Sequence, residues 1–389
     1  MRRGFFGGTF NPPHLGHIRA AAAAAKQLGL EALYWIPAGI PPHKELPAGS
    51  ADNAQRLEMA RLAAAEIPGA EVLDWEINRP GRSYTADTVE RFLSENIDGE
   101  LWILCGTDMF ETLPDWYRGD WLMKTLCVAV YPRKEGETAH LRELAKAYAR
   151  DYGTKVEVID IAPTDVSSTF LREELRKGKG AELLSRPVYG YVLRSRLYDV
   201  RPEPEVLWEL ALRWYQPKRV PHVQGCRETA VKLARRWGED VLDAETAAIL
   251  HDITKKTPVK EQLQFCEKCG IIIPNFAEEY EATFHAFSGA AAAVLEFGVS
   301  DRIRDAIMWH TTGKADMTLL EKIIWLADYM EPTRKTPGLD EVRELAFTDL
   351  DAAMCRAMEN SIHYMEGAGF HLHPATGEAL AFLRKEIHE

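Results

Sequence analysis

The sequence changes character near residue 195, and this change constrains the fold more than any other feature of the chain. Before it, short β-rich runs alternate with helical patterns. The β-rich runs cover residues 3–6, 32–37, 72–75, 101–105, 126–131 and 156–159, and the clearest helical patterns cover residues 17–28 and 55–66. Such alternation predicts a parallel sheet with helices on both faces and with ligands at the carboxyl ends of its strands.

Beyond residue 204 the strand signals nearly vanish. Helical patterns cover residues 205–215, 227–237, 244–251, 287–297, 301–310, 319–330, 340–346 and 349–365. The segment between the halves, residues 199–204, contains two prolines and breaks both patterns. The sequence therefore predicts an α/β domain over residues 1–198, a linker over 199–204 and an all-α domain over 205–389.

Charge and composition exclude several classes of protein. Residues 1–200 hold 25 basic and 28 acidic side chains and the rest holds 22 and 31, so a broad nucleic-acid surface is not expected. No apolar stretch reaches the roughly 18 residues of a membrane span, and no signal peptide is evident, so we expect a cytoplasmic protein without a membrane partner. Cys266 and Cys269 lack a second ligand pair, and we expect reduced cysteines on a helix rather than a zinc site. Both a monomer and a homo-oligomer remain open.

The first chemical motif follows directly on the first predicted strand. Gly7 and Gly8 allow the backbone to approach a ligand closely, and the next helix offers free N–H groups to a phosphate. His14 and His17 stand three residues apart at the start of that helix, so their side chains share a face. Two imidazoles there can donate hydrogen bonds to phosphate oxygens as charge builds in a transition state. The motif therefore indicates a site for nucleotide phosphates.

The complete motif resembles the nucleotidylyltransferase superfamily. Gly7-Gly8-Thr9-Phe10 with His14-Leu15-Gly16-His17 is similar to one family signature, and Ser167-Ser168-Thr169-Phe170-Leu171-Arg172 to the second. The resemblance implies a Rossmann-like α/β nucleotidyltransferase domain. It also implies attack of a substrate phosphate on the α-phosphate of a nucleoside triphosphate, with release of pyrophosphate. Arg172 is then expected to bind phosphate oxygens as a fork.

Three further strings resemble bacterial nicotinate-nucleotide adenylyltransferases. They are Pro41-Pro42-His43-Lys44, Arg82-Ser83-Tyr84-Thr85 with Asp87-Thr88, and Leu113-Pro114-Asp115-Trp116. The resemblance implies MgATP and nicotinate mononucleotide as substrates. It makes Lys44 a triphosphate ligand, Tyr84, Thr85 and Trp116 the residues that hold the pyridine nucleotide, and Gly106 and Asp108 contacts of ATP.

One residue departs from that family's pattern, and one alternative substrate stays open. Asn11 stands where the family commonly has Asp. A transferase for another phosphate acceptor, such as phosphopantetheine, is the alternative for this half. An acceptor panel would distinguish the two.

The second chemical motif lies in the helical half. His222, the adjacent pair His251-Asp252 and Asp328 follow one another in the order of a metal-ligand set. Imidazoles and carboxylates together favour iron, manganese or zinc. His285 and His310 lie between the pair and Asp328, and they supply enough ligands for a second ion. The six residues therefore predict a dinuclear centre that lowers the pKa of bound water and clamps a phosphate.

This half resembles the HD phosphohydrolases, and in particular the bacterial enzymes that split diadenosine tetraphosphate into two ADP. The strings that carry this resemblance are residues 251–255, 310–313 and 320–334. The resemblance implies an all-α HD domain with iron, or alternatively manganese or zinc, and makes Lys255 a catalytic phosphate ligand and Arg334 a substrate ligand. Hydrolysis of other nucleotides, such as alarmone-type guanosine polyphosphates, and a metal-binding regulatory module without turnover are the alternatives. His363, His371 and His373 are interpreted as structural or surface residues.

Overall fold

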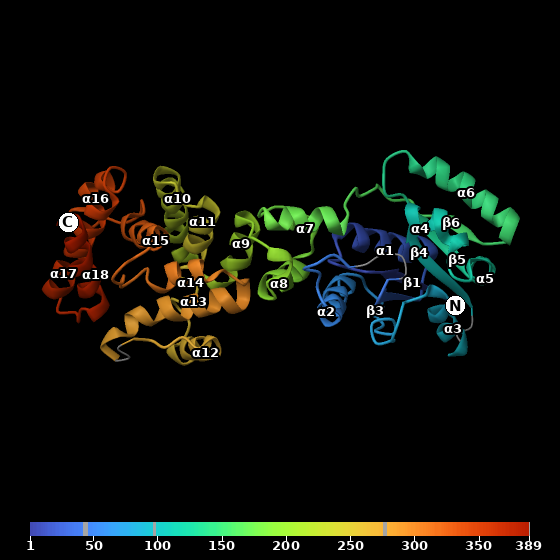
Figure 1. The fold of residues 1–389 in the computed structure, drawn as a ribbon, viewed down its shortest axis with the longest axis horizontal. Coiled ribbons are helices and arrows are strands. Elements are labelled where there is room, and N and C mark those ends of the chain that lie inside the picture. Colours follow the sequence, from blue (N-terminus) through green and yellow to red (C-terminus); the bar gives the residue numbers. More distant parts are fainter. Residues whose placement is uncertain (42–45, 96–98, 275–277, 389) are drawn as a thin grey trace. The chain divides into compact units, whose positions relative to one another are not determined.

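The amino-terminal part of the chain is a six-stranded parallel sheet with helices around it, as seen in a computed structural model that describes residues 1–41, 46–95, 99–274 and 278–388 (Figure 1). It forms one of two compact units and comprises residues 1–192 and 197–200. The strands are β1 (Arg2–Gly8), β2 (Ala32–Pro37), β3 (Ala70–Val72), β4 (Glu100–Gly106), β5 (Cys127–Tyr131) and β6 (Val156–Val158). The parallel sheet predicted from the sequence is thereby confirmed.

The order of the strands determines where a ligand can bind. The sheet runs β3-β2-β1-β4-β5-β6, and every neighbouring pair is parallel. The order reverses between β1 and β4, and in open parallel sheets the crevice at such a reversal is the usual ligand site. Gly8 ends β1 and Gly106 ends β4, so both predicted glycine motifs lie at that edge.

Helices cover both faces of this sheet. Phe5, Ile103 and Val128 point to one face, where they pack with apolar residues of α3, α4, α5 and α6. The alternate strand residues Phe6 and Trp35 are equally buried but lie outside this cluster, while α1 and α2 contact β1, β2 and β3. The helices of eight or more residues are α1 (Leu15–Leu28), α2 (Asn53–Ala64), α3 (Thr85–Ser94), α6 (Glu137–Tyr152), α7 (Ser168–Arg176) and α8 (Arg186–Arg194), and the shorter ones are α4 (Thr107–Thr112) and α5 (Gly119–Thr125).

The second unit, residues 193–196 and 201–389, is built from helices, and its described residues contain no strand. Its core is formed by α10, α11, α13, α14, α15 and α17, with apolar residues from all six in one buried cluster. The helices are α9 (Pro204–Ala211), α10 (Val220–Trp237), α11 (Val241–Leu250), α12 (Val259–Cys269), α13 (Phe284–Phe297), α14 (Asp301–Met308), α15 (Leu319–Met330), α16 (Leu339–Leu345), α17 (Leu350–Gly367) and α18 (Pro374–His388). The all-α prediction for this half is confirmed. The boundary with a linker over residues 199–204 stays a prediction.

Three local predictions were wrong. The strand expected over residues 72–75 is β3, which covers Ala70–Val72, because Trp75 packs on Phe92 of α3 and leaves the sheet. The helices expected to reach His251 and His310 end at Leu250 and Met308. After α11 the backbone bonds connect residues three apart, as in the bond from Ile253 N to Leu250 O, so the chain tightens into turns that carry the predicted metal ligands. Helix α18 was not predicted at all.

Among the described residues, no helix combines the length and the apolar character that a membrane crossing requires.

Candidate active sites

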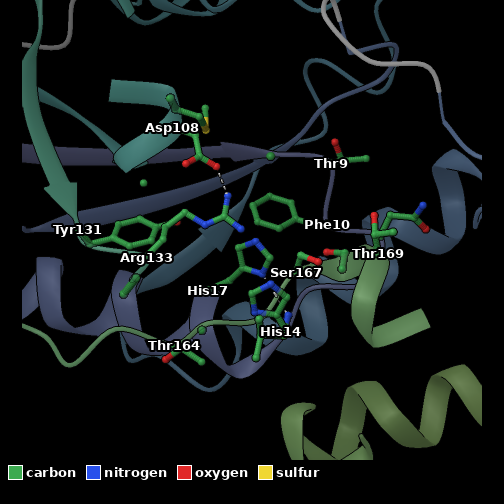
Figure 2. A pocket seen from close by; sticks show the side chains of 18 of the residues that line it. Thr9, Phe10, His14, His17, Asp108, Tyr131, Arg133, Thr164, Ser167 and Thr169 are labelled. Carbon is green, nitrogen blue, oxygen red and sulfur yellow. Dashed lines mark hydrogen bonds and ion pairs between the residues drawn. The ribbon is translucent and has the colours of Figure 1, made fainter. Parts of the chain in front are cut away.

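The loop between β1 and α1 forms one wall of a cavity of about 400 Å³ at the carboxyl edge of the sheet (Figure 2). A Cβ on Gly7 would contact nothing within 4 Å, so its missing side chain leaves the cavity open. A Cβ on Gly8 would lie 3.0 Å from the ring of Phe10, which in turn stacks on Trp35 at 4.8 Å between ring centroids. The two glycines therefore have different tasks, one toward the ligand and one toward the packing of the loop.

His14 and His17 lie at the start of α1, with their ring centroids 3.7 Å apart. Nδ1 of His17 accepts a hydrogen bond from the backbone N–H of His14 at 3.1 Å, so the proton of a neutral His17 is on Nε2. Burial, together with Arg133, lowers the pKa of His14 to about 4. Burial, His14 and Arg133 hold the pKa of His17 well below its usual value. Both rings are therefore neutral at pH 7 and act as hydrogen-bond donors rather than as cations.

The second signature lies across the same cavity, on α7. Ser167 caps this helix by accepting a hydrogen bond from Phe170 N, and the Ser168 hydroxyl donates to the carbonyl of Pro12 at 2.9 Å. Arg172 donates from Nη1 to the carbonyl of Asn11 at 2.7 Å and from Nη2 to Thr169 Oγ1 at 3.2 Å. Part of its guanidinium therefore binds the β1–α1 loop. The side chain that is expected to bind phosphate oxygens as a fork is thus the same one that positions this loop.

The structure brings together the predicted ATP contacts that it describes. Those that line the 400 Å³ cavity are Gly7, Gly8, Thr9, Phe10, His14, His17, Gly106, Asp108, Ser167, Ser168, Thr169 and Arg172. Lys44 lies outside the described residues, as do its neighbours Pro42 and His43. The individual roles of these residues remain predictions, but their grouping in one cavity follows from the meeting of β1, β4 and α7.

Sequence reasoning missed two arginines of this unit. Arg133 follows the end of β5, lines the cavity and donates from Nη1 to Asp108 at 2.6 Å, as the dashed line in Figure 2 shows. Arg56 on α2 is fully buried and donates to the carbonyls of Thr9, Ala38 and Gly39. The place of Arg133 after a β-rich run was a usable signal, whereas nothing in the sequence distinguishes Arg56 from a surface arginine.

A second cavity, of about 630 Å³, adjoins the first. Tyr84, Thr85 and Trp116 line it, as predicted for a pyridine site, together with Met109 and Tyr117. The ring centroids of Tyr84 and Tyr117 are 4.9 Å apart. Residues common to both cavities are Gly7, Gly8, Thr9, Asp108 and Met109. Two ligands bound in these cavities would therefore meet over the end of β1.

In the second unit, the six predicted metal ligands converge from five segments. His222 lies on α10, His285 on α13 and Asp328 on α15, whereas His251, Asp252 and His310 lie in the turns after α11 and α14. The exposed fraction of His251, Asp252 and His310 is at most 2%. Burial of so many ionisable side chains is costly unless they bind one another or a metal ion.

Hydrogen bonds orient all four histidines in the same way. Nδ1 of His251, His285 and His310 donates to the carbonyl oxygen three residues earlier, at 2.7–2.8 Å. Nδ1 of His222 is 3.1 Å from the buried carboxylate of Glu331. These bonds place the proton on Nδ1 and leave the Nε2 lone pair for a metal ion, which is the usual outer-shell arrangement. The role of Glu331 was not predicted.

The carboxylate of Asp252 lies between two groups of Nε2 atoms. Its Oδ2 is 3.6 Å from His251 and 3.9 Å from His222, and its Oδ1 is 3.2 Å from His285 and 3.7 Å from His310. Asp328 Oδ1 lies 3.1 Å from His222 Nε2 and completes the first group. Asp252 therefore presents one carboxylate oxygen to each group.

The electrostatics of the cluster fit cations better than protons. Burial lowers the pKa of His251 to about 3 and that of His285 to about 4. Burial alone would raise the pKa of Asp252, but the neighbouring histidines hold it well below its usual value. Asp252 Oδ1 and His310 Nε2 are buried and have no hydrogen-bond partner among the residues that the structure describes. Neutral imidazoles beside ionised carboxylates are what a divalent ion requires.

Three basic side chains surround this cluster. Arg334 Nη2 donates to Asp328 at 2.6 Å, and Lys255 Nζ is 2.9 Å from His285 Nε2. Both were predicted as ligands of phosphate or substrate. Arg219, which was not predicted, donates from Nε to Asp252 at 2.6 Å. It lies three residues before His222, at the N-cap of α10, and no motif in the sequence identifies it.

The remaining candidates lie away from the cluster. His363 and His371 are exposed, and the buried His373 accepts a hydrogen bond from Ala375 N. Cys266 and Cys269 are free thiols, and Cys269 donates to the carbonyl of Ala291. None of these residues belongs to a metal-binding group found among the described residues.

Comparisons with known proteins agree with the family expected for each half. Residues 5–174 match the cytidylyltransferase-like family and residues 219–333 the HD domain family. A probable nicotinate-nucleotide adenylyltransferase of Synechococcus sp. (strain JA-3-3Ab) is 37% identical over 198 residues, which are 51% of this chain and 94% of that protein. The symmetrical bis(5'-nucleosyl)-tetraphosphatase of Bacillus subtilis (strain 168) is 42% identical over 148 residues, which are 38% of this chain and 79% of that protein.

A solved structure is also similar to part of the chain. The crystal structure of a predicted HD superfamily hydrolase involved in NAD metabolism from Clostridium acetobutylicum has 32% sequence identity and a TM-score of 0.43, and the match covers 47% of this chain and 97% of that one. The chain therefore unites a member of the nicotinate-nucleotide adenylyltransferase family, in its first half, with a member of the HD domain family in its second.

Proposed function

We propose that the first unit transfers the adenylyl group of ATP to nicotinate mononucleotide, releasing pyrophosphate and forming nicotinate adenine dinucleotide for NAD synthesis. One observation carries this proposal. The cavity of about 400 Å³ beside His14 and His17 (the phosphate cavity) and the cavity of about 630 Å³ beside Tyr84 and Trp116 (the aromatic cavity) share the residues at the end of β1. Nicotinate mononucleotide would bind with its pyridine ring beside Tyr84 and Trp116. Its 5'-phosphate would then point toward the α-phosphate of an ATP held near His14 and His17. The adenylyltransferase relatives support the choice of substrates.

The side chains act by position and by hydrogen bonding. The Nε2–H of His17 and the N-terminus of α1 donate to the phosphate oxygens on which negative charge accumulates, and Arg133 adds a positive charge nearby. The acceptor phosphate is already a nucleophile, so no protein base is needed for the attack. Mg²⁺ bound with ATP would neutralise charge on the triphosphate. Asp108, whose exposed carboxylate lines the cavity, would be the residue that contacts this ion.

A panel of acceptors tests this half. The purified chain with MgATP is offered nicotinate mononucleotide, nicotinamide mononucleotide or phosphopantetheine, and pyrophosphate release is measured. We expect turnover with the first, and a Trp116→Ala variant should raise the KM for that acceptor more than the KM for ATP. Pyrophosphate release with phosphopantetheine but not with nicotinate mononucleotide would assign the unit to the alternative transferase.

We further propose that the second unit is a metal-dependent phosphohydrolase that splits diadenosine tetraphosphate symmetrically into two ADP. The Nε2 atoms on both sides of the Asp252 carboxylate carry this proposal, and the tetraphosphatase relative supports the choice of substrate. His222, His251, Asp252 and Asp328 would hold one ion, and His285, His310 and Asp252 the other, with iron, manganese or zinc as the metal. When bound, the ions supply an activated water and polarise a phosphoryl oxygen.

The basic side chains give the substrate its orientation. Arg219 and Arg334 donate to the carboxylates of Asp252 and Asp328, and Lys255 Nζ contacts His285. These three side chains would bind the oxygens of a polyphosphate, and Arg334 could do so as a fork. Burial lowers the pKa of Lys255 below its usual value.

Product analysis tests this half. Diadenosine tetraphosphate and a guanosine polyphosphate are incubated with the metal-loaded chain, and the products are separated by chromatography. Two ADP per diadenosine tetraphosphate, lost in an Asp252→Asn variant, is the expected result. ATP with AMP as products would exclude the symmetrical reaction. Turnover of the guanosine polyphosphate alone would favour another phosphohydrolase, and metal binding without any turnover would indicate a regulatory module.

A further inference from the structure

A cysteine lies at the edge of the predicted metal centre and was not among its expected ligands. Cys226 follows His222 by four residues on α10, so the two side chains share one face of the helix. Its side chain is 1% exposed, and its Sγ lies 3.4 Å from His222 Nε2. The potential ligand atoms of Cys226, His222, His251 and Asp328 all lie within 4.8 Å of one another.

We propose that the thiolate of Cys226 is a metal ligand and binds the same ion as His222, His251 and Asp328. This inference rests on the metal centre proposed above and adds a sulfur atom to its nitrogen and oxygen ligands. The metal–sulfur bond forms as the thiol proton leaves to water, so the step needs no oxidant or reductant.

The distances fit a shared ion. On one ion with bonds of about 2.0–2.1 Å to nitrogen and about 2.3 Å to sulfur, two nitrogens whose bonds enclose the tetrahedral angle lie about 3.3 Å apart, and a nitrogen and a sulfur about 3.6 Å apart. The observed separation of His222 Nε2 from His251 Nε2 is 3.3 Å, and from Cys226 Sγ it is 3.4 Å. The cysteine therefore stands where a ligand of the first ion would stand.

The surroundings of Cys226 differ from those of a core cysteine. Cys355, which is also buried, belongs to the apolar core cluster of this unit, whereas Cys226 does not. Cys226 instead faces the cluster that contains Asp252 Oδ1 and His310 Nε2, both buried without a hydrogen-bond partner among the described residues. Those two atoms belong to the neighbouring second position, whereas the potential ligand atoms within 4.8 Å of the cysteine sulfur come from His222, His251 and Asp328.

The sulfur predicts which metals the first position prefers. Thiolate ligands favour zinc, iron and cobalt, whereas manganese and magnesium prefer oxygen. The first position should therefore bind Co²⁺ or Zn²⁺ more tightly than Mn²⁺. The second position, formed by His285, His310 and Asp252, has no sulfur among its described ligands and should discriminate less.

Cobalt titration of the full-length chain tests the proposal. Metal is removed with a chelator, Co²⁺ is added, and absorption is recorded. The wild type should develop a near-ultraviolet sulfur-to-cobalt charge-transfer band, which Cys226→Ser and Cys226→Val should lose. The variants Cys355→Ala and Cys266→Ser/Cys269→Ser are matched controls that should keep it. In competition with a chelator, the Cys226 variants should bind the first ion at least about tenfold more weakly, the scale at which outer-shell partners already act.

Each remaining outcome has a definite meaning. If Co²⁺ binds with its visible bands and the wild type lacks the sulfur band, or Cys226→Val retains it, Cys226 is not a ligand and the metal centre still stands. If no Co²⁺ binds to a wild-type chain whose circular dichroism shows it folded, the metal centre fails together with the inference. Circular dichroism of the metal-free variants shows whether a variant lost the band because it misfolded. If Cys226→Ser misfolds, the result for Cys226→Val, whose side chain has a similar volume, decides whether Cys226 is a ligand.

Discussion

The imidazole of His17 has its tautomer fixed by one backbone hydrogen bond, from His14 N to Nδ1. Its Nε2–H is therefore a preorganised donor toward the phosphate cavity. Such donors act on the transition state because they need no reorientation when charge develops. A cationic His17 would instead need a negatively charged partner to offset the loss of hydration on burial.

Replacing His17 by alanine should lower kcat for adenylyl transfer by about 10²–10³-fold, since the loss of one oxyanion donor has an effect of that size. The KM for ATP should change little, because the donor acts mainly on the transition state. Steady-state pyrophosphate release measures both constants. His140→Ala, at an exposed histidine paired with Glu111, is the control and should be near wild type. A large rise in KM with unchanged kcat would contradict the assigned role.

The lowered pKa of His14 predicts how stability depends on pH. Its pKa is about 4 in the folded protein and 6.5 when unfolded, so the unfolded chain binds more protons between these values. The contribution is fully present above pH 6.5 and is lost as the pH falls toward 4, by about 3 kcal/mol in total. Denaturant unfolding of wild type and His14→Asn from pH 7 to 4.5 measures it. The stability difference between the two proteins should shrink with acid, and a constant difference would refute the prediction.

At the scale of elements, Arg56 connects α2 to the ends of β1 and β2. Its guanidinium donates to three carbonyls and to Asn53 Oδ1. Arg56→Met keeps the apolar stem but leaves these acceptors unpaired, and it should lower the free energy of unfolding of this unit by about 3 kcal/mol. Arg61→Met on the same helix removes only a half-exposed pair with Glu58, and its effect should stay below about 0.5 kcal/mol. Equal effects in chemical denaturation would contradict the assignment.

Glu331 connects α10 with the end of α15. Its carboxylate is 3.1 Å from His222 Nδ1 and accepts hydrogen bonds from Thr333. The approach is close because Gly225 has no side chain: a Cβ there would lie 2.7 Å from Glu331 Oε2. Glu331→Gln should weaken metal binding about 10–100-fold by removing the charge behind His222. Chelator competition measures the change, with the exposed Glu341→Gln as control. Unchanged affinity would show that Glu331 is only structural.

At the scale of the whole molecule, the two predicted sites lie in different units, so metal should act on one of them alone. A metal ion that binds only the folded state stabilises it by about 2.7 kcal/mol at 100 times its Kd. Removal of metal by a chelator should therefore lower the calorimetric transition of the helical unit and leave that of the sheet unit in place. Adenylyl transfer assayed afterwards with fresh MgATP should be unchanged. A simultaneous shift of both transitions would show that the units are coupled.

The sequence by itself determined the fold class of each half, and its motifs predicted residues that the structure brings together in each candidate site. Period and alternation report which face of a strand or helix is buried, and that is enough to distinguish a parallel sheet from a helical bundle. Motifs such as Gly7–His17 and His251–Asp252 consist of residues close together in the chain, so the chemistry that they indicate can be inferred from the sequence alone.

Only the tertiary structure decided which distant residues complete the sites. Arg133, Arg219, Glu331 and Cys226 carry no motif, and they acquire a role because β5, α10 and the end of α15 bring them beside predicted residues. The periodicity of a short stretch of sequence cannot predict such contacts, because the groups that form them are far apart in the chain and close in space.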